Sequence, residues 1–547
     1  MRKPLPSLCL EKIFWEIYNG EVINNDPLST ILDIRNTLFN CLLVNRDFCR
    51  HVIPILWRNT FNWYLPSSKL IISYLYFLSS ESRFNLTRRL NIDISGLLDS
   101  SNKRRPFFNY SSYLRELEYH SVFKSVQELW PKETTRERNQ QNIEYQLIMA
   151  EEICKMFLIQ CPTLYRLDLA TDLNFLNPFK FTSLTSTKSC LIKLREFKCS
   201  DHPDQVKIFN ILSNTCHNIE KMQLGIFRRN FNDKLLYEGI RQLLRSQRYL
   251  KEFICSFAQK GFISIIGPVF PISLQEVTLH ACDLDEEVDP FDYFMECHNL
   301  TTLTLIDCNN LQGSHLTALK NLKKMKLNIV YNKPIQYYDV KSIIIHSNIT
   351  LTNLLLDDII EPYSLIEDVT NYCPNIIHLR ANISANVLPQ IPLLFKSLKK
   401  LEIIELRNEK TFYENLVPIT ISNELAIEIS RSIPSTLYSF TFLLMGVFNS
   451  QSLALFLEQL DERSIIMSDT SYDNKDEYID DEYIDDEYID IEMNQVIFEE
   501  FYIRIDLDEY NESKGEHFKL FKEFECTKYL HGNNSCLIPT YVEELDE

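Results

Sequence analysis

The sequence predicts an α+β chain of several domains, in which a small N-terminal module of three helices precedes an α/β solenoid built on a parallel sheet. Three observations lead to this prediction. The first sixty residues carry apolar side chains at helical spacing, and an apolar pattern then recurs about every 22 to 31 residues through the middle of the chain. The residues after each recurrence have helical periodicity. One strand and one helix cannot enclose a core, so these units must stack.

The N-terminal module is expected to begin with a short amphipathic helix. Pro6 is tolerated in its first turn, because the N–H group there would have no partner within the helix. Apolar residues then follow at helical spacing: Leu10, Ile13, Phe14 and Ile17. A second helix is predicted from Leu38 to Cys49, and a third short piece ends at Trp57. Helices this short bury little against one another, so we expect their remaining apolar surface to contact a partner.

These sixty residues resemble an F-box. The resemblance is carried by Leu5-Pro6, then Ile13-Phe14, then the run from Leu42 to Phe48, which reads Leu-Leu-Val-Asn-Arg-Asp-Phe, and finally Leu56-Trp57. The sequence departs from the family where Leu8 replaces the usual acidic residue. A second departure is the long connection from Gly20 to Thr37, which we expect to loop out.

The resemblance implies docking onto a Skp-type adaptor and, through it, onto a cullin-based ubiquitin ligase. The positions that match the family's adaptor contacts are Leu5, Pro6, Leu10, Ile13, Leu43, Val44 and Trp57. The alternative interpretation is an ordinary N-terminal helical bundle.

The clearest repeat has the form Leu300-x-x-Leu303-x-Leu305-x-x-Cys308. The same core returns with these first residues: Leu164, Leu194, Ile219, Leu250, Leu274, Leu322, Leu351, Ile376, Leu398, Leu437 and Phe498. The Leu-x-Leu alternation predicts a strand with one buried face, and the residues after it, as in Tyr363 to Cys373, predict a helix. The variable positions between the buried residues should point outward from the sheet, which makes that surface the expected recognition face.

Four cysteines fall three residues before the first core residue of their repeats: Cys161, Cys216, Cys297 and Cys373. Zinc needs four convergent ligands at short spacing, whereas stacked repeats place these sulfurs in different turns, and no Cys-x-x-Cys pair occurs. We therefore expect buried structural cysteines, and no metal or cofactor. The units resemble the cysteine-containing class of leucine-rich repeats, which commonly follow an F-box. This class implies a horseshoe with a parallel sheet on its concave side.

An acidic segment interrupts the late repeats. The five residues Asp476 to Asp480, which read Asp-Glu-Tyr-Ile-Asp, recur twice more up to Asp490. From Asp469 to Glu509 the chain has 17 acidic and two basic residues, which accounts for most of its net charge of -19. A segment with this much charge cannot form a hydrophobic core, so it is predicted to be a disordered insertion. The alternative is a docking strip for a basic partner, or a set of tyrosines for phosphorylation.

The predicted domains are therefore 1–64, the F-box-like module; 65–160, a helical linker or solenoid cap without a repeat core; 161–467, the repeats; 468–492, the acidic insertion; and 493–547, a terminal repeat or C-terminal cap. Outside the acidic segment the chain is nearly neutral, so nucleic acid is not an expected partner. The 15 cysteines follow a start, Met1 to Pro4, without the apolar run of a signal peptide, which favours reduced thiols in the cytoplasm or nucleus. No apolar run approaches the roughly twenty residues that cross a bilayer.

The sequence favours binding over catalysis. With only ten glycines it has no phosphate-cradling loop and no Gly-x-Ser-x-Gly elbow, and its 11 histidines include no His-Glu-x-x-His pair. The leading hypothesis is a substrate receptor of a Skp-cullin-F-box ligase, which binds the adaptor through the N-terminal module and a protein target through the repeats. The alternative is a leucine-rich-repeat scaffold or sensor that never enters a ligase.

Overall fold

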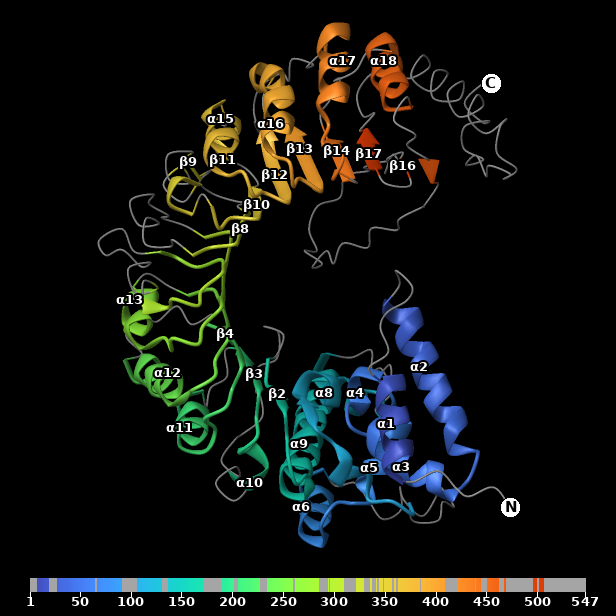
Figure 1. The fold of residues 1–547 in the computed structure, drawn as a ribbon. Helices are drawn as coiled ribbons and strands as arrows, with labels where there is room; N and C mark the ends of the chain where they lie inside the picture. The colour runs from blue at the N-terminus through green and yellow to red at the C-terminus, as the bar shows by residue number, and fades with distance from the viewer. Residues whose placement is uncertain are drawn as a thin grey trace. The chain divides into compact units, whose positions relative to one another are not determined.

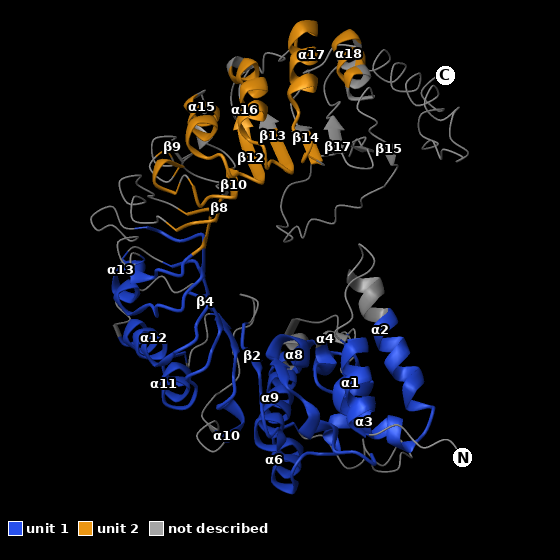
Figure 2. Cartoon of the chain, in the orientation of Figure 1, with its two compact units in different colours: residues 1–300 blue, residues 301–547 orange. Residues whose placement is uncertain are grey.

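The computed structural model describes residues 7–18, 27–63, 66–90, 106–129, 136–170, 188–200, 205–226, 234–258, 261–284, 294, 296–308, 321–328, 335–336, 341, 344–347, 349–356, 359–360, 363–383, 385–408, 421–437, 439–443, 450–461, 467–468, 495–498 and 501–505. The chain forms two compact units, Met1–Leu300 and Thr301–Glu547 (Figure 2). The acidic repeats between Asp476 and Asp490 lie outside the described residues.

The first unit begins with helices and continues into strand and helix repeats (Figure 1). Its helices are α1 Ser7–Tyr18, α2 Pro27–Leu42, α3 Arg46–Leu56, α4 Thr60–Trp63, α5 Ser68–Leu75, α6 Ser80–Leu90, η1 Tyr110–Tyr113, α8 Tyr119–Gln127, α9 Arg136–Gln160, α10 Lys188–Leu191, α11 Gln205–Thr215, α12 Lys234–Ser246, α13 Phe262–Ile266 and η3 Gly267–Val269. Its strands are β1 Glu116–Glu118, β2 Arg166–Asp168, β3 Glu196–Ser200, β4 Lys221–Gly225, β5 Glu252–Ser256 and β6 Glu276–His280. They form a parallel sheet in sequence order.

The second unit continues the same repeat pattern. Its strands pair in the order β7 Thr302–Ile306, β8 Lys324–Asn328, β10 Asn353–Leu356, β12 His378–Ile383, β13 Ile403–Asn408, β14 Ser439–Leu443, β17 Phe501–Ile505, β16 Gln495–Phe498 and β15 Met467–Ser468. The pairs from β7 to β17 are parallel and the last two are antiparallel. A separate parallel pair joins β9 Ile335–Gln336 and β11 Ile359–Ile360. Its helices are α15 Tyr363–Tyr372, η6 Ala385–Gln390, α16 Ile391–Ser397, α17 Asn423–Ser432 and α18 Ser450–Asp461.

Most predicted repeat cores are confirmed. Equivalent core residues lie opposite one another on neighbouring strands, as Leu167 does to Phe197 and Phe197 to Met222, and all three are buried. Burial alternates along the strands, so the residues between the core positions face outward. The chain is therefore a solenoid of leucine-rich repeats in each unit.

Three predictions about the repeats are wrong. The core predicted to start at Phe498 is displaced by two residues, because Ile503, not Phe501, lies opposite Phe440. Residues 65–160 do contain a repeat core, because Leu114, Leu117 and Tyr119 are buried and Leu117 lies opposite Leu167. The core predicted to start at Leu398 is displaced by three residues. Ile404, not Leu401, lies opposite Leu379 in the sheet, so Leu401 is the first core residue of that repeat.

The helices of the N-terminal module also differ from the prediction. The stretch from Gly20 to Thr37 does not simply loop out, because α2 begins at Pro27 and places Ile34 and Leu38 one turn apart on its inner side. The helix predicted from Leu38 to Cys49 is broken after Leu42. Asn45 caps the following helix α3, since its Oδ1 accepts a hydrogen bond of 2.9 Å from the N–H of Phe48.

A ladder of backbone hydrogen bonds joins the start of each repeat to the one before it. The carbonyl oxygen of Arg115 accepts from the N–H groups of Tyr165 and Arg166, at 2.7 and 3.3 Å, and the oxygen of Tyr165 accepts from Arg195 and Glu196. The same pattern continues to Gln275 and Glu276. It also extends backward, because the oxygen of Arg58 accepts from Arg115 and Glu116 at 2.8 and 3.3 Å. The residues after α3 thus occupy the place of a preceding repeat.

Candidate functional site

The N-terminal helices α1, α2 and α3 pack on one another around a small core. The buried members of this core are Leu10, Phe14, Leu38, Val52, Ile55 and Leu56. The ring of Phe14 meets the ring of Phe48 edge to face with centroids 5.1 Å apart. The hydroxyl of Ser7 lies 2.8 Å from Nε2 of His51, which ties the start of α1 to α3. The three helices therefore hold one another through a shared interior.

The same module leaves several large apolar side chains in solvent. Their exposed fractions are 79% for Leu8, 44% for Ile13, 51% for Phe39, 81% for Leu43 and 60% for Val44. Leu43 and Val44 occupy the turn between α2 and α3, while Leu8 and Ile13 lie on α1. Exposed large apolar side chains on one small module are candidates for contact with a partner.

The predicted adaptor-contact residues are placed in three different settings. Leu5 and Pro6 lie outside the described residues. Ile13, Leu43 and Val44 are exposed, as an adaptor contact requires, whereas Leu10 is only 5% exposed and belongs to the module's own core.

Trp57 is half-buried and packs inside the first unit. Its ring stacks on Tyr110 with centroids 3.8 Å apart and meets Tyr74 edge to face at 5.4 Å. Tyr74 in turn meets Phe157 of α9 at 4.7 Å. Trp57 therefore connects the N-terminal module to the helices that lead into the repeats.

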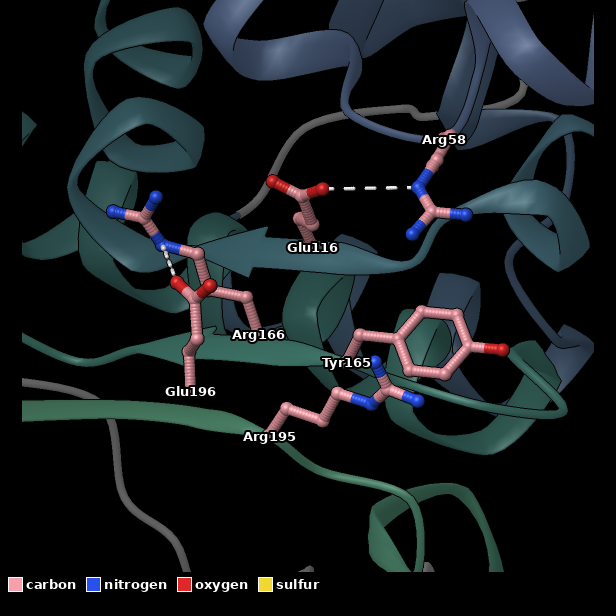
Figure 3. A pocket seen from close by; sticks show the side chains of 6 residues that line it. All are labelled: Arg58, Glu116, Tyr165, Arg166, Arg195 and Glu196. Atoms are coloured by element: carbon pink, nitrogen blue, oxygen red, sulfur yellow. Dashed lines mark ion pairs between the residues drawn. The ribbon is translucent and has the colours of Figure 1, made fainter. Parts of the chain in front are cut away.

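A cavity of about 410 Å³ lies where the module meets the first strands (Figure 3). It is lined by Arg58, Glu116, Tyr165, Arg166, Arg195 and Glu196. The backbone ladder brings these residues together, because Arg58 follows α3 and accepts from the start of β1, while the other five lie at or directly before the first residue of β1, β2 or β3.

Tyr165 forms the aromatic wall of this cavity. The guanidinium carbon of Arg58 lies 5.0 Å from the centroid of the Tyr165 ring, and that of Arg195 lies 5.8 Å from it. Arg58 also lies over Trp15 of α1 at 5.1 Å. Cation–π contacts of this kind hold the planar guanidinium groups in place.

Two carboxylates share the cavity with the three arginines. Oε1 of Glu116 lies 3.7 Å from Nε of Arg58, and Oε2 of Glu196 lies 3.9 Å from Nε of Arg166 (Figure 3). Burial raises the pKa of Glu116, although the nearby charges of Arg58 and Arg166 oppose the rise. The cavity is therefore polar and carries a small excess of positive charge.

Charged residues of alternating sign continue from the cavity across the outward face of the first unit. They lie opposite one another in register, in the order Glu116, Arg166, Glu196, Lys221 and Glu252. Nζ of Lys221 is 2.8 Å from Oε1 of Glu252. This face suits a partner with mixed charge.

The outward face of the second unit has a different chemistry. Arg380 binds Glu405 through two hydrogen bonds of 2.8 Å, and Nε2 of His378 lies 3.1 Å from the same carboxylate. Lys324 and Lys326 stand on β8 of the same sheet. The fork between Arg380 and Glu405 satisfies both groups, which favours a structural role for this pair.

The repeat cysteines are structural, as the sequence predicts. The thiol of Cys161 donates to the carbonyl of Leu114 at 2.7 Å, and that of Cys216 donates to Leu191 at 3.0 Å, so each bonds to the preceding repeat. Burial raises the pKa of Cys216 and Cys373 to about 12. Within the described ranges no disulfide joins the cysteines, and no group of three or more His, Cys, Asp or Glu is arranged to hold a metal ion.

Sequence reasoning did not identify the cavity residues as a group. The signal available was that Tyr165 and Arg195 each directly follow the first core residue of a repeat. Among the helices that the structure describes, none combines the length and apolarity needed to cross a bilayer.

No protein-family model matches this chain, and no curated protein matches it. The solved structures that it resembles are distant. The leucine-rich repeat-containing protein LegL7 from Legionella pneumophila is 11% identical with a TM-score of 0.30, over 49% of this chain and 91% of LegL7.

Two further solved structures match over about half of this chain. The TLR13–ssRNA13 complex gives 18% identity and a TM-score of 0.30, over 53% of this chain and 44% of the other. The Toll–Spatzle complex from Drosophila gives 13% identity and a TM-score of 0.32, over 55% of this chain and 39% of the other. The assignment to leucine-rich repeats rests on the strand register and burial described above.

Proposed function

We propose that this protein is the substrate-recognition subunit of a Skp-cullin-F-box ubiquitin ligase. In this function the N-terminal module binds a Skp-type adaptor, the adaptor links it to a cullin scaffold, and the outward face of the repeats holds a protein target. The target is then ubiquitinated and degraded by the proteasome. The chain has no catalytic residue in this mechanism, and it acts in the cytoplasm or nucleus.

The observation that carries the adaptor assignment is the exposure of Leu43 and Val44. Both lie at positions that match the F-box pattern, and both stand in solvent in the turn between α2 and α3 although they are large and apolar. An exposed apolar turn costs solubility unless a partner covers it. Ile13, which is 44% exposed on α1, adds to this surface.

The way the module is joined to the repeats supports a receptor that works by proximity. The carbonyl of Arg58 continues the backbone ladder of the repeats, and Trp57 stacks on Tyr110. An adaptor bound to the module and a target bound to β1, β2 or β3 would therefore be held in a fixed relation within the first unit. Such fixed placement raises the effective concentration of target lysines near a conjugating enzyme.

The test is co-purification of a Skp-type adaptor with the full chain. The variant Leu43→Ser combined with Val44→Ser should lose the adaptor, because it removes two exposed apolar contacts without opening the core. A matched control is Leu235→Ser combined with Leu393→Ser, since these leucines are 72% and 58% exposed on α12 and α16. Equal recovery of the adaptor by the wild type and the turn variant would contradict the docking assignment.

The second candidate function is a leucine-rich-repeat interaction scaffold outside any ligase. The mixed-charge outward face of the first unit is as compatible with this function as with the ligase subunit. Stacked repeats present an extended binding surface that does not depend on the function of the N-terminal module. The abundance of a captured target, measured with and without cullin inhibition, separates the two functions. A rise in the target on inhibition supports the ligase subunit, and no change supports the scaffold.

A further inference from the structure

We propose that the cavity between the N-terminal module and strands β1 to β3 binds an oxyanion side chain of a protein partner, either a carboxylate or a phosphorylated serine. The inference deepens the proposed function and rests on it only in treating the ligand as part of a protein target. The chemistry comes from Arg58, Arg166 and Arg195, which all line this space.

The first step is that the ion pairs of the three arginines are long. Nε of Arg58 is 3.7 Å from Glu116, Nε of Arg195 is 3.7 Å from Glu220, and Arg166 makes contacts of 3.5 and 3.9 Å with Asp168 and Glu196. Charge-assisted hydrogen bonds are normally about 2.7 to 2.9 Å long. In the second unit, Arg380 reaches that length with Glu405 twice. The contacts of the cavity arginines with their carboxylates are longer, at 3.5 to 3.9 Å.

The second step is that three of their four acidic partners have a closer donor than the arginine. Glu116 accepts from Nδ2 of Asn59 at 2.7 Å, and Glu220 accepts from Nζ of Lys251 at 2.7 Å. Asp168 accepts from the N–H of Ala170 at 2.9 Å and also lies 3.6 Å from Lys198. In each of these three residues the closer N–H or NH₃⁺ donor binds one carboxylate oxygen and the arginine lies beside the other at 3.5 to 3.7 Å, so the arginines retain capacity to donate.

The third step is that this capacity faces the cavity. Arg58 and Arg195 approach Glu116 and Glu220 most closely through Nε, and both guanidinium groups line the cavity beside the Tyr165 ring (Figure 3). Planar guanidinium groups match the geometry of carboxylate and phosphate oxygens. A volume of about 410 Å³ accommodates one or two side chains of a bound segment.

The experiment measures fluorescence anisotropy of the full chain with three labelled peptide libraries. The libraries share random flanking positions and differ in a fixed central residue, which is phosphoserine, glutamate or serine. We expect the phosphoserine or the glutamate library to bind and the serine library not to bind. Which anionic library binds more tightly identifies the source of the oxyanion.

Single substitutions in the cavity should change the affinity for the anionic libraries in opposite directions. Arg166→Gln and Arg195→Gln should each weaken binding of the anionic library about tenfold, as the loss of one charge-assisted contact predicts. Glu196→Gln should strengthen binding, because it removes the negative charge beside Arg166. The control Arg245→Gln removes an exposed arginine on α12, outside the cavity, and should change nothing.

Binding of the serine library as tight as that of the anionic libraries, or unchanged affinity in both cavity arginine variants, would overturn the proposal. So would the absence of binding to all three libraries. Arg195 is 65% exposed, so Arg195→Gln keeps the test valid even if Arg166→Gln impairs folding. The Arg195→Gln variant should capture the adaptor as well as the wild type does. If the wild-type chain binds an anionic library but captures no adaptor, the ligase assignment is wrong and the proposed oxyanion site still stands.

Discussion

The indole of Trp57 stacks on the ring of Tyr110 with centroids 3.8 Å apart and planes inclined by only 11°. The contact joins the end of the N-terminal helices to the segment that precedes β1. Together with the carbonyl of Arg58, which receives the N–H groups of Arg115 and Glu116, it makes the module and the first repeats one packed body.

Replacing Trp57 by alanine should therefore destabilise the first unit. The substitution removes the stack on Tyr110 and the edge contact with Tyr74, and loss of a large packed aromatic side chain costs about 3 kcal/mol. Thermal and urea unfolding of the full chain, followed by circular dichroism, measure the effect. Phe107→Ala is the control, because Phe107 is 89% exposed. Equal unfolding midpoints for Trp57→Ala and wild type would contradict the structural role of the stack.

The pKa of Glu116 predicts a dependence of stability on pH. Burial raises the pKa of this carboxyl in the folded state above its value in the unfolded state, so the folded state binds the carboxyl proton more tightly. Folding therefore becomes less favourable as pH rises through the raised pKa, because the buried carboxyl must then ionise. Glu116→Gln removes this penalty and can still accept from Asn59. Its stability relative to wild type should be higher at pH 7 than at about pH 4, where the wild-type carboxyl is protonated.

Thermal midpoints of both proteins at the two pH values provide the measurement. Glu276→Gln removes a negative charge from an exposed position on β6 of the same sheet and controls for net charge. A relative stability of Glu116→Gln that is the same at both pH values would show that the carboxyl is not shifted.

The repeat cysteines should resist alkylation in the folded protein. At pH 8 a thiol whose pKa is about 12, as for Cys216 and Cys373, is ionised to only about one part in ten thousand, and both side chains are fully buried. Cys9 on α1 is exposed and should react first. Mass spectrometry after brief treatment with iodoacetamide reads each site, with a urea-unfolded sample as the control. Rapid native labelling of Cys216 would contradict the packing of its repeat.

Ala281, which directly follows β6, offers a test of backbone strain. Its φ of 50° lies in the left-handed region, where a side chain costs about 1 to 2 kcal/mol relative to glycine. Ala281→Gly should stabilise the protein slightly, by about 0.5 kcal/mol once the flexibility of unfolded glycine is counted. Ala281→Val should destabilise it, because a β-branched residue tolerates this region poorly. Urea midpoints rank the three proteins, and a midpoint for the valine variant at or above that of wild type would exclude strain here.

Most strands could be located from the sequence. Two apolar residues separated by one residue, at the same place in each repeat, show which face of the strand is buried. It was ambiguous at Leu398, Leu401 and Ile404, which are spaced by three and allow two overlapping frames. Only the pairing of Ile404 with Leu379 decides between them. The core at Leu114 was missed because it ends in Tyr119 and lies well outside the repeat period.

The candidate site was predictable in part. The F-box pattern selected Leu43 and Val44, which are exposed, but the sequence placed them inside a helix and could not distinguish them from Leu10 and Trp57, whose burial depends on packing against distant segments. The cavity was beyond sequence reasoning. Arg58 and Tyr165 are over a hundred residues apart, and only the backbone ladder brings them to the same place.

That ladder has a practical consequence for making fragments of this protein. A fragment that begins at residue 65, where the sequence suggested a domain boundary, would lose the carbonyl of Arg58 and expose the N–H groups of Arg115 and Glu116 at the open edge of β1. Exposed strand edges pair with other chains and lead to aggregation. Expression of the repeats in soluble form therefore requires the N-terminal helices, whether or not an adaptor is present.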